Sequence, residues 1–259
     1  MSLSFKVVIP ARYGATRLPG KPLRMLADKP LVQHVHERAL DSGAEEVVVA
    51  TDDPRIAAAV EGFGGEAALT AAAHPSGTDR VAEVARSRGW PEQTIVVNLQ
   101  GDEPLMPPAL VRQVAGDLAA HSDAGVATLC ALLETTAELF DPHVVKVVMD
   151  AAGYALYFSR APIPWDRDAF AVTTEALPRG LQHFRHIGLY AYRCGFLSRY
   201  AELEPCALEH TESLEQLRAL WHGVRIHVGE AGELPGQGID TEQDLERVAA
   251  LLAAAGGRD

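Results

Sequence analysis

Cysteine is scarce in this sequence, and long apolar runs are missing. The 259 residues include three cysteines, Cys130, Cys194 and Cys206, which lack the close spacing of zinc or redox motifs. We interpret them as free thiols in a reducing compartment, and as small buried side chains without a chemical role. No apolar run approaches the roughly 18 residues that a membrane-spanning helix needs, and the first residues lack the pattern of a secretory signal. We therefore expect a cytoplasmic protein without a membrane partner.

An excess of positive charge is also absent. The chain has 35 acidic residues against 23 lysines and arginines, which gives a formal net charge of −12 at pH 7. Since we find no basic stripe, this charge predicts that nucleic acid is repelled and is not a partner. A hydrophobic fraction of 47% and a charged fraction of 22% are typical of a folded globular chain. At this length we expect a single domain over residues 1–259.

A cationic loop follows the first predicted strand. Residues 5–9 form an apolar run, and the next segment, PARYGATRLPGKPL at residues 10–23, carries Arg12, Arg17 and Lys21. Glycine lets backbone N–H groups approach phosphate oxygens, while arginine offers a two-point fork and lysine a movable charge. The loop therefore predicts a phosphate site at the carboxyl edge of a sheet. The alternative is that the three cations are only solvated loop charges.

Two common nucleotide motifs do not fit this loop. A Walker A loop has four residues between its glycines and a Ser or Thr after its lysine. Here Gly14 and Gly20 enclose five residues, and Pro22 follows Lys21. Residues 11–14 also stand where the glycine fingerprint of an NAD-dependent oxidoreductase would lie. The loop therefore argues against both a P-loop enzyme and a dinucleotide-dependent oxidoreductase.

The first half of the chain alternates strand-like and helix-like segments. We predict buried parallel strands at residues 5–9, 46–51, 94–100 and 124–133. We predict helices at residues 30–43, 53–62, 107–121 and from 78 onward. This order predicts an α/β fold, a predominantly parallel sheet with helices on both faces. Ligands then bind where loops leave the carboxyl ends of the strands.

In the second half of the chain, the predicted strands and helices no longer alternate regularly. Two strand-like runs, 144–149 and 154–158, flank a four-residue turn and predict a β-hairpin insertion. Strands at 187–193 and 224–229 and helices at 209–220 and 241–255 follow. The segment from about 162 to 185 is the most loop-like. We interpret the region around 140–190 as a hairpin or dimerisation excursion.

Two aspartates are candidate metal ligands. Asp102 follows the strand at 94–100, and therefore lies at the sheet edge where we expect the cationic loop. A carboxylate beside a phosphate site predicts a bridging divalent cation, most naturally Mg²⁺, although Asp102 alternatively caps the next turn. Asp240 precedes the last predicted helix, and the residues alone favour a helix N-cap for it.

A small polar loop precedes the third predicted helix. It runs from His74 to Arg80 and contains Ser76, Gly77 and Thr78. Such a loop at a helix N-terminus suits the reading of a base edge or the holding of an anion by backbone N–H groups. An ordinary turn capped by Ser or Thr explains it equally well.

Several segments together resemble one known family. They are residues 10–23, 76–80, 98–104, 154–160 with 163–167, and 208–210 with 215–218. These segments are similar to those of the CMP-Kdo synthetases, the 3-deoxy-manno-octulosonate cytidylyltransferases, and the resemblance covers about residues 7–248. It implies a Rossmann-like nucleotidyltransferase fold, CTP and the acidic sugar Kdo as substrates, Mg²⁺ as cofactor and a cytoplasmic homodimer. The implied product is CMP-Kdo for lipopolysaccharide biosynthesis.

The resemblance also implies roles for residues. It makes Arg12, Lys21, Asp102 and Asp240 catalytic, with Arg12 and Lys21 on the CTP phosphates and both aspartates on Mg²⁺. The nucleotide would further contact Ser76, Gly77, Thr78, Arg80 and Gln100. The sugar would contact Arg160, His186, Tyr190, Glu215 and Gln216.

In the implied reaction the anomeric hydroxyl of Kdo attacks the α-phosphorus of CTP, without a covalent enzyme intermediate. The resemblance assigns Arg160 and His186 to the sugar carboxylate. Two alternatives stay open. One is a cytidylyltransferase for another acidic sugar, such as sialic acid or an amino variant of Kdo. The other is a regulatory module that binds CTP without releasing pyrophosphate.

Overall fold

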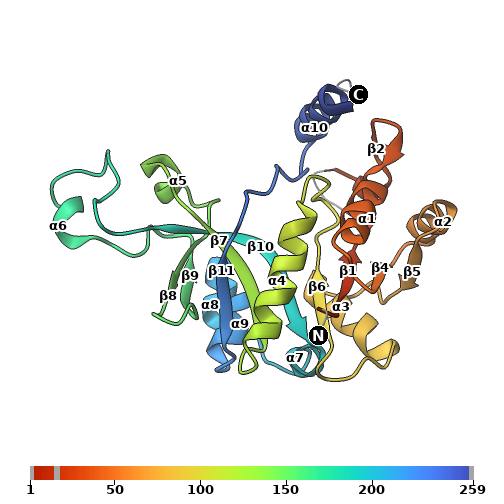
Figure 1. The fold of residues 1–259 in the computed structure, drawn as a ribbon, viewed down its shortest axis with the longest axis horizontal. Helices are drawn as coiled ribbons and strands as arrows, with labels where there is room; N and C mark the ends of the chain where they lie inside the picture. Colours follow the sequence, from red (N-terminus) through yellow and green to blue (C-terminus); the bar gives the residue numbers. More distant parts are fainter. Residues whose placement is uncertain (1–2, 15–17, 257–259) are drawn as a thin grey trace.

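A seven-strand path of paired strands forms the centre of the molecule. The computed structural model describes residues 3–14 and 18–256, so the predicted phosphate contact Arg17 lies outside the described residues. The strand order is β11-β7-β10-β6-β1-β4-β5, and β8 and β9 extend the sheet beside β10 (Figure 1). Strand β1 (Lys6–Pro10) pairs in parallel with β4 (Glu46–Thr51) and with β6 (Ile95–Asn98). The predicted strands are confirmed here, with slightly different bounds.

Strand β1 is buried because the sheet is covered on both faces. Its Val7 and Ile9 pack into one hydrophobic core, and Val8 packs into the other. Such two-sided burial explains why the strand is a continuous apolar run rather than an alternating one. The neighbouring strand β5 (Glu66–Leu69) continues the parallel pairing from β4, and our sequence analysis did not predict it.

Within the seven-strand path described above, one strand breaks the parallel arrangement. Strand β10 (Phe184–Arg193) lies between β6 and β7 (Val126–Leu132), and it runs antiparallel to both. Strand β11 (Ile226–Glu230) then pairs in parallel with β7. The prediction that the strand at 124–133 is part of a parallel pairing is therefore right on the β11 side and wrong on the β10 side.

Helices cover the two faces of the sheet. One face carries α1 (Leu31–Asp41), α2 (Pro54–Gly62) and α4 (Pro108–Ala120), whose apolar side chains share one core. The opposite core contains side chains of α3 (Gly77–Ser87) and α7 (Cys194–Tyr200). This arrangement confirms the predicted α/β fold, although α7 itself was not predicted.

Two adjacent short helices replace one predicted helix. The segment at 209–220 is divided between α8 (Ala207–Glu212) and α9 (Gln216–Trp221), which extend slightly beyond it, so the prediction of one continuous helix is wrong. Ser213 ends α8 with a φ of 52°, in the left-handed region that stops a helix. An ion pair between Glu209 and Arg218, at 2.5 Å, then ties the two helices together.

An arm projects from the body of the molecule. It contains α5 (Thr136–Phe140), the hairpin of β8 (Lys146–Met149) and β9 (Ala155–Ser159), and the single turn α6 (Arg167–Phe170), as Figure 1 shows. The hairpin confirms the predicted insertion, and the stretch around α6 is mostly loop as expected. The assignment of residues 1–259 to one domain stays a prediction.

The carboxyl-terminal helix packs near the cationic loop. Helix α10 (Glu242–Gly256) follows a long connection from β11. Its Leu245 and Val248 pack with Leu26 and Leu31 at the hairpin of β2 (Met25–Leu26) and β3 (Lys29–Pro30) and the start of α1. This packing brings the residues before α10 next to the loop after β1. In the part of the chain that the structure describes, we found no helix with the length and apolar character needed to cross a membrane.

Candidate active site

Two adjoining cavities lie at the carboxyl ends of the parallel strands. The first, which we call the loop cavity, has a volume of about 400 Å³ and is lined by the loop after β1, the start of α3, the turn after β6 and Asp240. The second, the tyrosine cavity, has a volume of about 260 Å³ and is lined by residues of β10, α7 and α9. Gly77, Gln100 and Glu215 line both cavities. A ligand can therefore extend from one cavity into the other.

Three cations from different elements line the loop cavity. They are Arg12 directly after β1, Lys21 in the short 3-10 turn at Lys21–Leu23, and Arg80 on α3. Arg80 is only 4% exposed and lies 3.6 Å from the carboxylate of Asp52. Burial lowers the pKa of Arg80, but a guanidinium remains charged at neutral pH. The cavity thus presents fixed positive charge to an anionic ligand.

Lys21 joins the two predicted metal ligands. Its Nζ donates hydrogen bonds to Asp102 at 2.8 Å and to Asp240 at 3.1 Å. A third bond, of 2.7 Å, goes to the backbone carbonyl of Ile239. Asp102 follows β6 and Asp240 precedes α10, so the fold brings together carboxylates that are far apart in the sequence. The result is a cluster of two negative charges around one positive charge.

Asp240 is not the N-cap of α10, contrary to the role that the residues alone favoured. Thr241 caps the helix, because its hydroxyl accepts a hydrogen bond from the backbone N–H of Asp244 at 3.2 Å. The Asp244 carboxylate accepts in turn from the backbone N–H of Thr241 at 2.9 Å, which completes a capping box. The Asp240 side chain is therefore available to the cluster around Lys21.

The loop before α3 is a capped helix start that also lines the loop cavity. Ser76 is the N-cap of α3, since its hydroxyl accepts from the backbone N–H of Asp79 at 3.3 Å. Gly77 lies against neighbouring elements, and a Cβ on it would be 3.4 Å from Pro10. The helix N-terminus, where backbone N–H groups favour anions, therefore faces the loop cavity.

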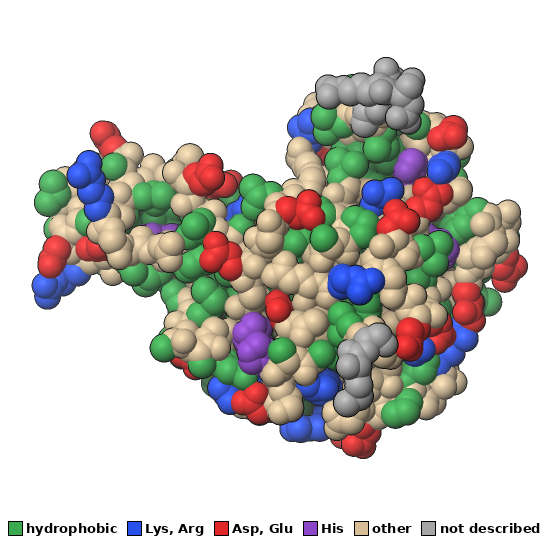
Figure 2. All heavy atoms as spheres, viewed as in Figure 1, with side chains coloured by type: hydrophobic (Ala, Val, Ile, Leu, Met, Phe, Trp, Pro, Cys, Tyr) green, Lys and Arg blue, Asp and Glu red, His purple; other side chains and the backbone are tan. Residues whose placement is uncertain are grey.

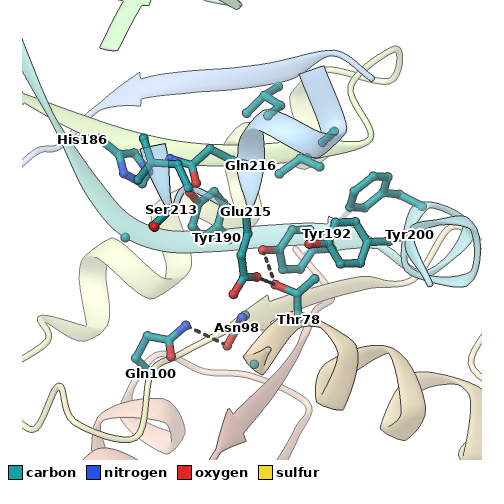
Figure 3. Close-up of a pocket in the computed structure, with 17 residues that line it drawn as sticks. Thr78, Asn98, Gln100, His186, Tyr190, Tyr192, Tyr200, Ser213, Glu215 and Gln216 are labelled. Carbon is teal, nitrogen blue, oxygen red and sulfur yellow. Dashed lines mark hydrogen bonds between the residues drawn. The ribbon is translucent and has the colours of Figure 1, made fainter. Parts of the chain in front are cut away.

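Aromatic side chains form one wall of the tyrosine cavity. Tyr190, Tyr192, Phe196 and Tyr200 follow one another with ring centroids 5.6 to 5.8 Å apart. The Tyr192 hydroxyl lies 3.4 Å from the hydroxyl of Thr78, as Figure 3 shows. Burial raises the pKa of Tyr192, so its hydroxyl stays protonated and can donate a hydrogen bond. This wall suits a neutral polyhydroxylated ring, which has apolar faces and polar edges.

Glu215 lies at the junction of the cavities. Its carboxylate accepts a hydrogen bond of 3.0 Å from the Thr78 hydroxyl, and Figure 3 shows it between Tyr190 and Asn98. Desolvation by the surrounding protein raises the pKa of Glu215, while the hydrogen bond from Thr78 acts in the opposite direction. A carboxylate at this position can accept hydrogen bonds from the hydroxyls of a ligand.

The structure gathers almost all predicted site residues around the two cavities. Gln100, His186 and Gln216 line the tyrosine cavity together with Tyr190 and Thr78. His186 is an uncharged imidazole, because burial lowers its pKa to about 3. Its predicted contact with a carboxylate of the ligand stays a prediction.

Arg160 is the exception. It is not among the described residues that line either cavity. Its guanidinium donates to the backbone carbonyls of Glu212 at 2.7 Å and Pro142 at 2.8 Å, where it links the arm to α8. Contact between Arg160 and a sugar stays a prediction.

Sequence reasoning missed some residues of the site. Tyr192 and Tyr200 line the tyrosine cavity, and Thr128 contacts His186 from β7. Tyr192 could have been predicted, because residues two apart on a strand lie on the same face and Tyr190 was already a candidate. Glu103, beside Asp102, was also missed; burial raises its pKa to about 8, and the charges of its aspartate neighbours add to this effect.

Comparison with known proteins identifies the class of the fold. The sequence matches the family described as cytidylyltransferase over residues 6–226. A solved structure of CMP:2-keto-3-deoxy-manno-octonic acid synthetase complexed with CTP superposes with a TM-score of 0.88. It is 44% identical, with 97% of this chain and 100% of that chain covered. A cytidylyltransferase from Leptospira borgpetersenii, 17% identical over 98% of this chain and 88% of its own, shares the fold with a TM-score of 0.62. The fold is that of the nucleotidyltransferases.

Comparison with relatives of similar length identifies the family within this class. The 3-deoxy-manno-octulosonate cytidylyltransferase of Pseudomonas fluorescens is 60% identical over 98% of this chain and 100% of its own length. The enzyme of that name from Thioalkalivibrio sulfidiphilus is 61% identical over 97% of this chain and 100% of its own. The chain therefore belongs to the 3-deoxy-manno-octulosonate cytidylyltransferase, or CMP-Kdo synthetase, family. This result confirms the resemblance on which the predicted function was based.

The capping geometry predicts different stabilities for two alanine variants. Thr241→Ala removes the cap of α10 and should lower the free energy of unfolding by about 1 kcal/mol. Asp240→Ala should lower it by less than about 0.5 kcal/mol, because Asp240 is half exposed and shares its ammonium with a second carboxylate. Denaturant unfolding of both variants measures the difference. An equal loss in the two variants would restore the capping role to Asp240.

Proposed function

We propose that this chain transfers the cytidylyl group of CTP to 3-deoxy-D-manno-octulosonate, with release of pyrophosphate, for lipopolysaccharide biosynthesis. The observation that carries the proposal is the junction of a cationic cavity with an aromatic one at Gly77, Gln100 and Glu215. A polyanionic nucleotide suits the first cavity and a polyhydroxylated sugar the second. The names of the relatives with about 60% identity support the same assignment.

The loop cavity would hold the nucleotide. Arg12 and Lys21 carry charge for the phosphates, and Arg80 contributes from α3. The N-terminus of α3, with Ser76 and Gly77, adds backbone donors of the kind that bind anions. Gln100 has an amide that can donate and accept at a base edge.

The donor set of the cluster around Lys21 fits Mg²⁺. Asp102 and Asp240 offer the hard carboxylate oxygens that this ion prefers. The described residues hold no group of three or more His, Cys, Asp or Glu side chains placed to bind a metal. The two aspartates would therefore hold the ion together with oxygens of the substrates and water. When bound, it supplies positive charge against the phosphates and polarises the oxygens around it.

The proposed reaction is a direct displacement. The anomeric hydroxyl oxygen of the sugar bonds to the α-phosphorus of CTP, the bond from that phosphorus to pyrophosphate breaks, and the hydroxyl proton passes to solvent. The cations of the loop cavity stabilise the charge on the phosphates, while Tyr190, Glu215 and Gln216 orient the sugar by its hydroxyls. Holding both reactants in line at the cavity junction supplies much of the rate enhancement.

The arm is the surface that we propose for dimerisation. Large apolar side chains are exposed on it, and Val172, at 85%, is the most exposed of them. Figure 2 shows hydrophobic side chains spread over the projecting arm. Exposed apolar surface of this kind favours association with a partner, here a second copy of the chain. The molar mass in solution tests the dimer.

The three cysteines are free and buried, which agrees with the proposal of a cytoplasmic protein.

Incubation of the purified protein with each nucleoside triphosphate and a panel of acidic sugars tests the proposed function. We expect pyrophosphate release only with CTP and Kdo. Release with sialic acid, or with an amino variant of Kdo, would instead assign a different sugar substrate. CTP binding without pyrophosphate release under any condition would identify a regulatory module and contradict the proposal.

Loss of either carboxylate of the cluster should abolish most of the activity. Asp102→Asn and Asp240→Asn each remove a charge at nearly constant volume, so kcat should fall at least about a hundredfold while the fold is retained. Pyrophosphate release at saturating Mg²⁺ measures the effect, and thermal unfolding checks the fold. Asp41→Asn, at a carboxylate of α1 that is 57% exposed and lines neither cavity, is the matched control and should keep full activity. Wild-type turnover in Asp240→Asn would remove this residue from the metal site.

Removal of Lys21 should act mainly on the nucleotide. Lys21→Ala should raise the KM for CTP and lower kcat, by about tenfold or more in kcat/KM, because a charged phosphate contact serves both binding and the transition state. The KM for Kdo should change far less. Steady-state kinetics with each substrate varied separate the two effects.

Lys29→Ala is the matched control for Lys21→Ala, because Lys29 pairs with Glu37 on the surface at 2.9 Å and is outside both cavities. It should leave both KM values unchanged. Equal losses for CTP and Kdo in Lys21→Ala would show that Lys21 only holds the loop in place.

A further inference from the structure

A bulge in β10 lies directly beside His186. The pairing of β10 with β7 places Ile187 opposite Leu129 and then Tyr190 opposite Thr128, so two residues of β10 have no partner on β7. Such a bulge locally frees backbone groups from the ladder of the sheet. Thr128 is fully buried at this point, with 0% exposure.

The hydroxyl of Thr128 has more neighbours than it has protons. Its Oγ1 lies 3.1 Å from the carbonyl oxygen of Ile187 and 2.9 Å from that of Leu189. It also lies 2.9 Å from Nε2 of His186. Both carbonyl oxygens can only accept, and the hydroxyl has one proton to donate.

Counting protons fixes the direction of the bond to His186. If Thr128 donated its proton to Nε2, no proton would lie between its oxygen and the carbonyl oxygens of Ile187 and Leu189. Neither of these contacts would then be a hydrogen bond. If it donates to the bulge, through one proton shared between the carbonyl oxygens of Ile187 and Leu189, its oxygen is free to accept from an Nε2–H of His186, and each contact then contains a proton. Buried polar groups are nearly always satisfied, so the second arrangement is the favoured one. A neutral imidazole that donates at Nε2 has an acceptor at Nδ1.

We propose that Thr128 is a positioning residue that holds His186 as the neutral Nε2–H tautomer, so that Nδ1 accepts a hydrogen bond from a hydroxyl of the ligand in the tyrosine cavity. The rings of Phe158 and Tyr190, with centroids 5.0 and 5.3 Å from that of His186, limit its rotation. Figure 3 shows His186 at one end of this cavity. The low pKa of His186 agrees with a ring that stays neutral. The identity of the ligand as a sugar rests on the proposed function, but the tautomer does not.

The tautomer can be measured in the ligand-free protein. In two-dimensional NMR of ¹⁵N-labelled full-length chain, the two ring nitrogens of His186 should show the pattern of a protonated Nε2 and an unprotonated Nδ1 at neutral pH. Thr128→Val removes the hydroxyl and should shift the ring toward a mixture of tautomers, whereas Thr128→Ser should keep the wild-type pattern. A wild-type ring protonated at Nδ1, or an unchanged pattern in Thr128→Val, would overturn the proposal.

Kinetics give an independent measurement. Thr128→Val should raise the KM for Kdo about tenfold, the usual effect of one lost hydrogen bond, with little change in the KM for CTP. Thr128→Ser should restore most of the wild-type KM. Ser42→Ala, which removes a buried hydroxyl that donates to Ala39 and lines neither cavity, is the matched control and should leave both KM values unchanged.

The variants also separate this proposal from the proposed function. Equal increases of both KM values in Thr128→Val, or no rescue by Thr128→Ser, would show that Thr128 only supports the sheet and would overturn the positioning role. If Thr128→Val does not fold, the wild-type spectrum and Thr128→Ser still decide the tautomer. If the wild type releases no pyrophosphate but shows the predicted tautomer, the proposed function fails and the assignment of His186 stands.

Discussion

The ammonium of Lys21 between the carboxylates of Asp102 and Asp240 is the interaction on which the site depends. It joins the loop after β1, the turn after β6 and the segment before α10. Two carboxylates that share one ammonium repel each other, and the positive charge between them offsets this repulsion. The same demand for positive charge makes the position suitable for a divalent cation and for the phosphates that accompany it. The apolar packing of α10 against α1 is what holds Asp240 within reach.

The antiparallel strand β10 creates the second cavity. A wholly parallel sheet would place another strand end beside β6, with loops above it. Instead β10 presents Tyr190 and Tyr192 next to Asn98 and Val96 along its length, so an aromatic wall continues directly from the nucleotide side. Thr128 is buried under the bulge of the same strand and contacts His186 there. The reversal of one strand thus explains why the two cavities adjoin and why they differ in polarity.

The sequence alone was sufficient to predict elements whose structure depends on local chemistry. The apolar run of β1 and the start of α2 at Asp53 could both be identified, because strand burial and helix starts have local patterns. Ser213 ends α8 in the left-handed conformation, and no local residue pattern predicted this helix end. Asp240 and Thr241 compete for the same capping position, so only the packed structure could assign them. Contacts such as that between Thr128 and His186 join residues distant in sequence, and the strand pairing that creates them is a property of the whole sheet.

The charges of the two cavities constrain how the proposed sugar can bind. Kdo is a 2-keto acid, so its anomeric carbon is bonded directly to its carboxylate. Among the described residues that line the tyrosine cavity there is no lysine or arginine; His186 is neutral, and Glu215 is an acid. Burying a carboxylate there without a partner would be costly, whereas the loop cavity has Arg12 and Lys21. Electrostatics therefore favours the loop cavity for the acidic end of the proposed sugar. This orientation would place the anomeric hydroxyl beside the nucleotide phosphates, so the charge pattern that binds the sugar would also orient its nucleophile.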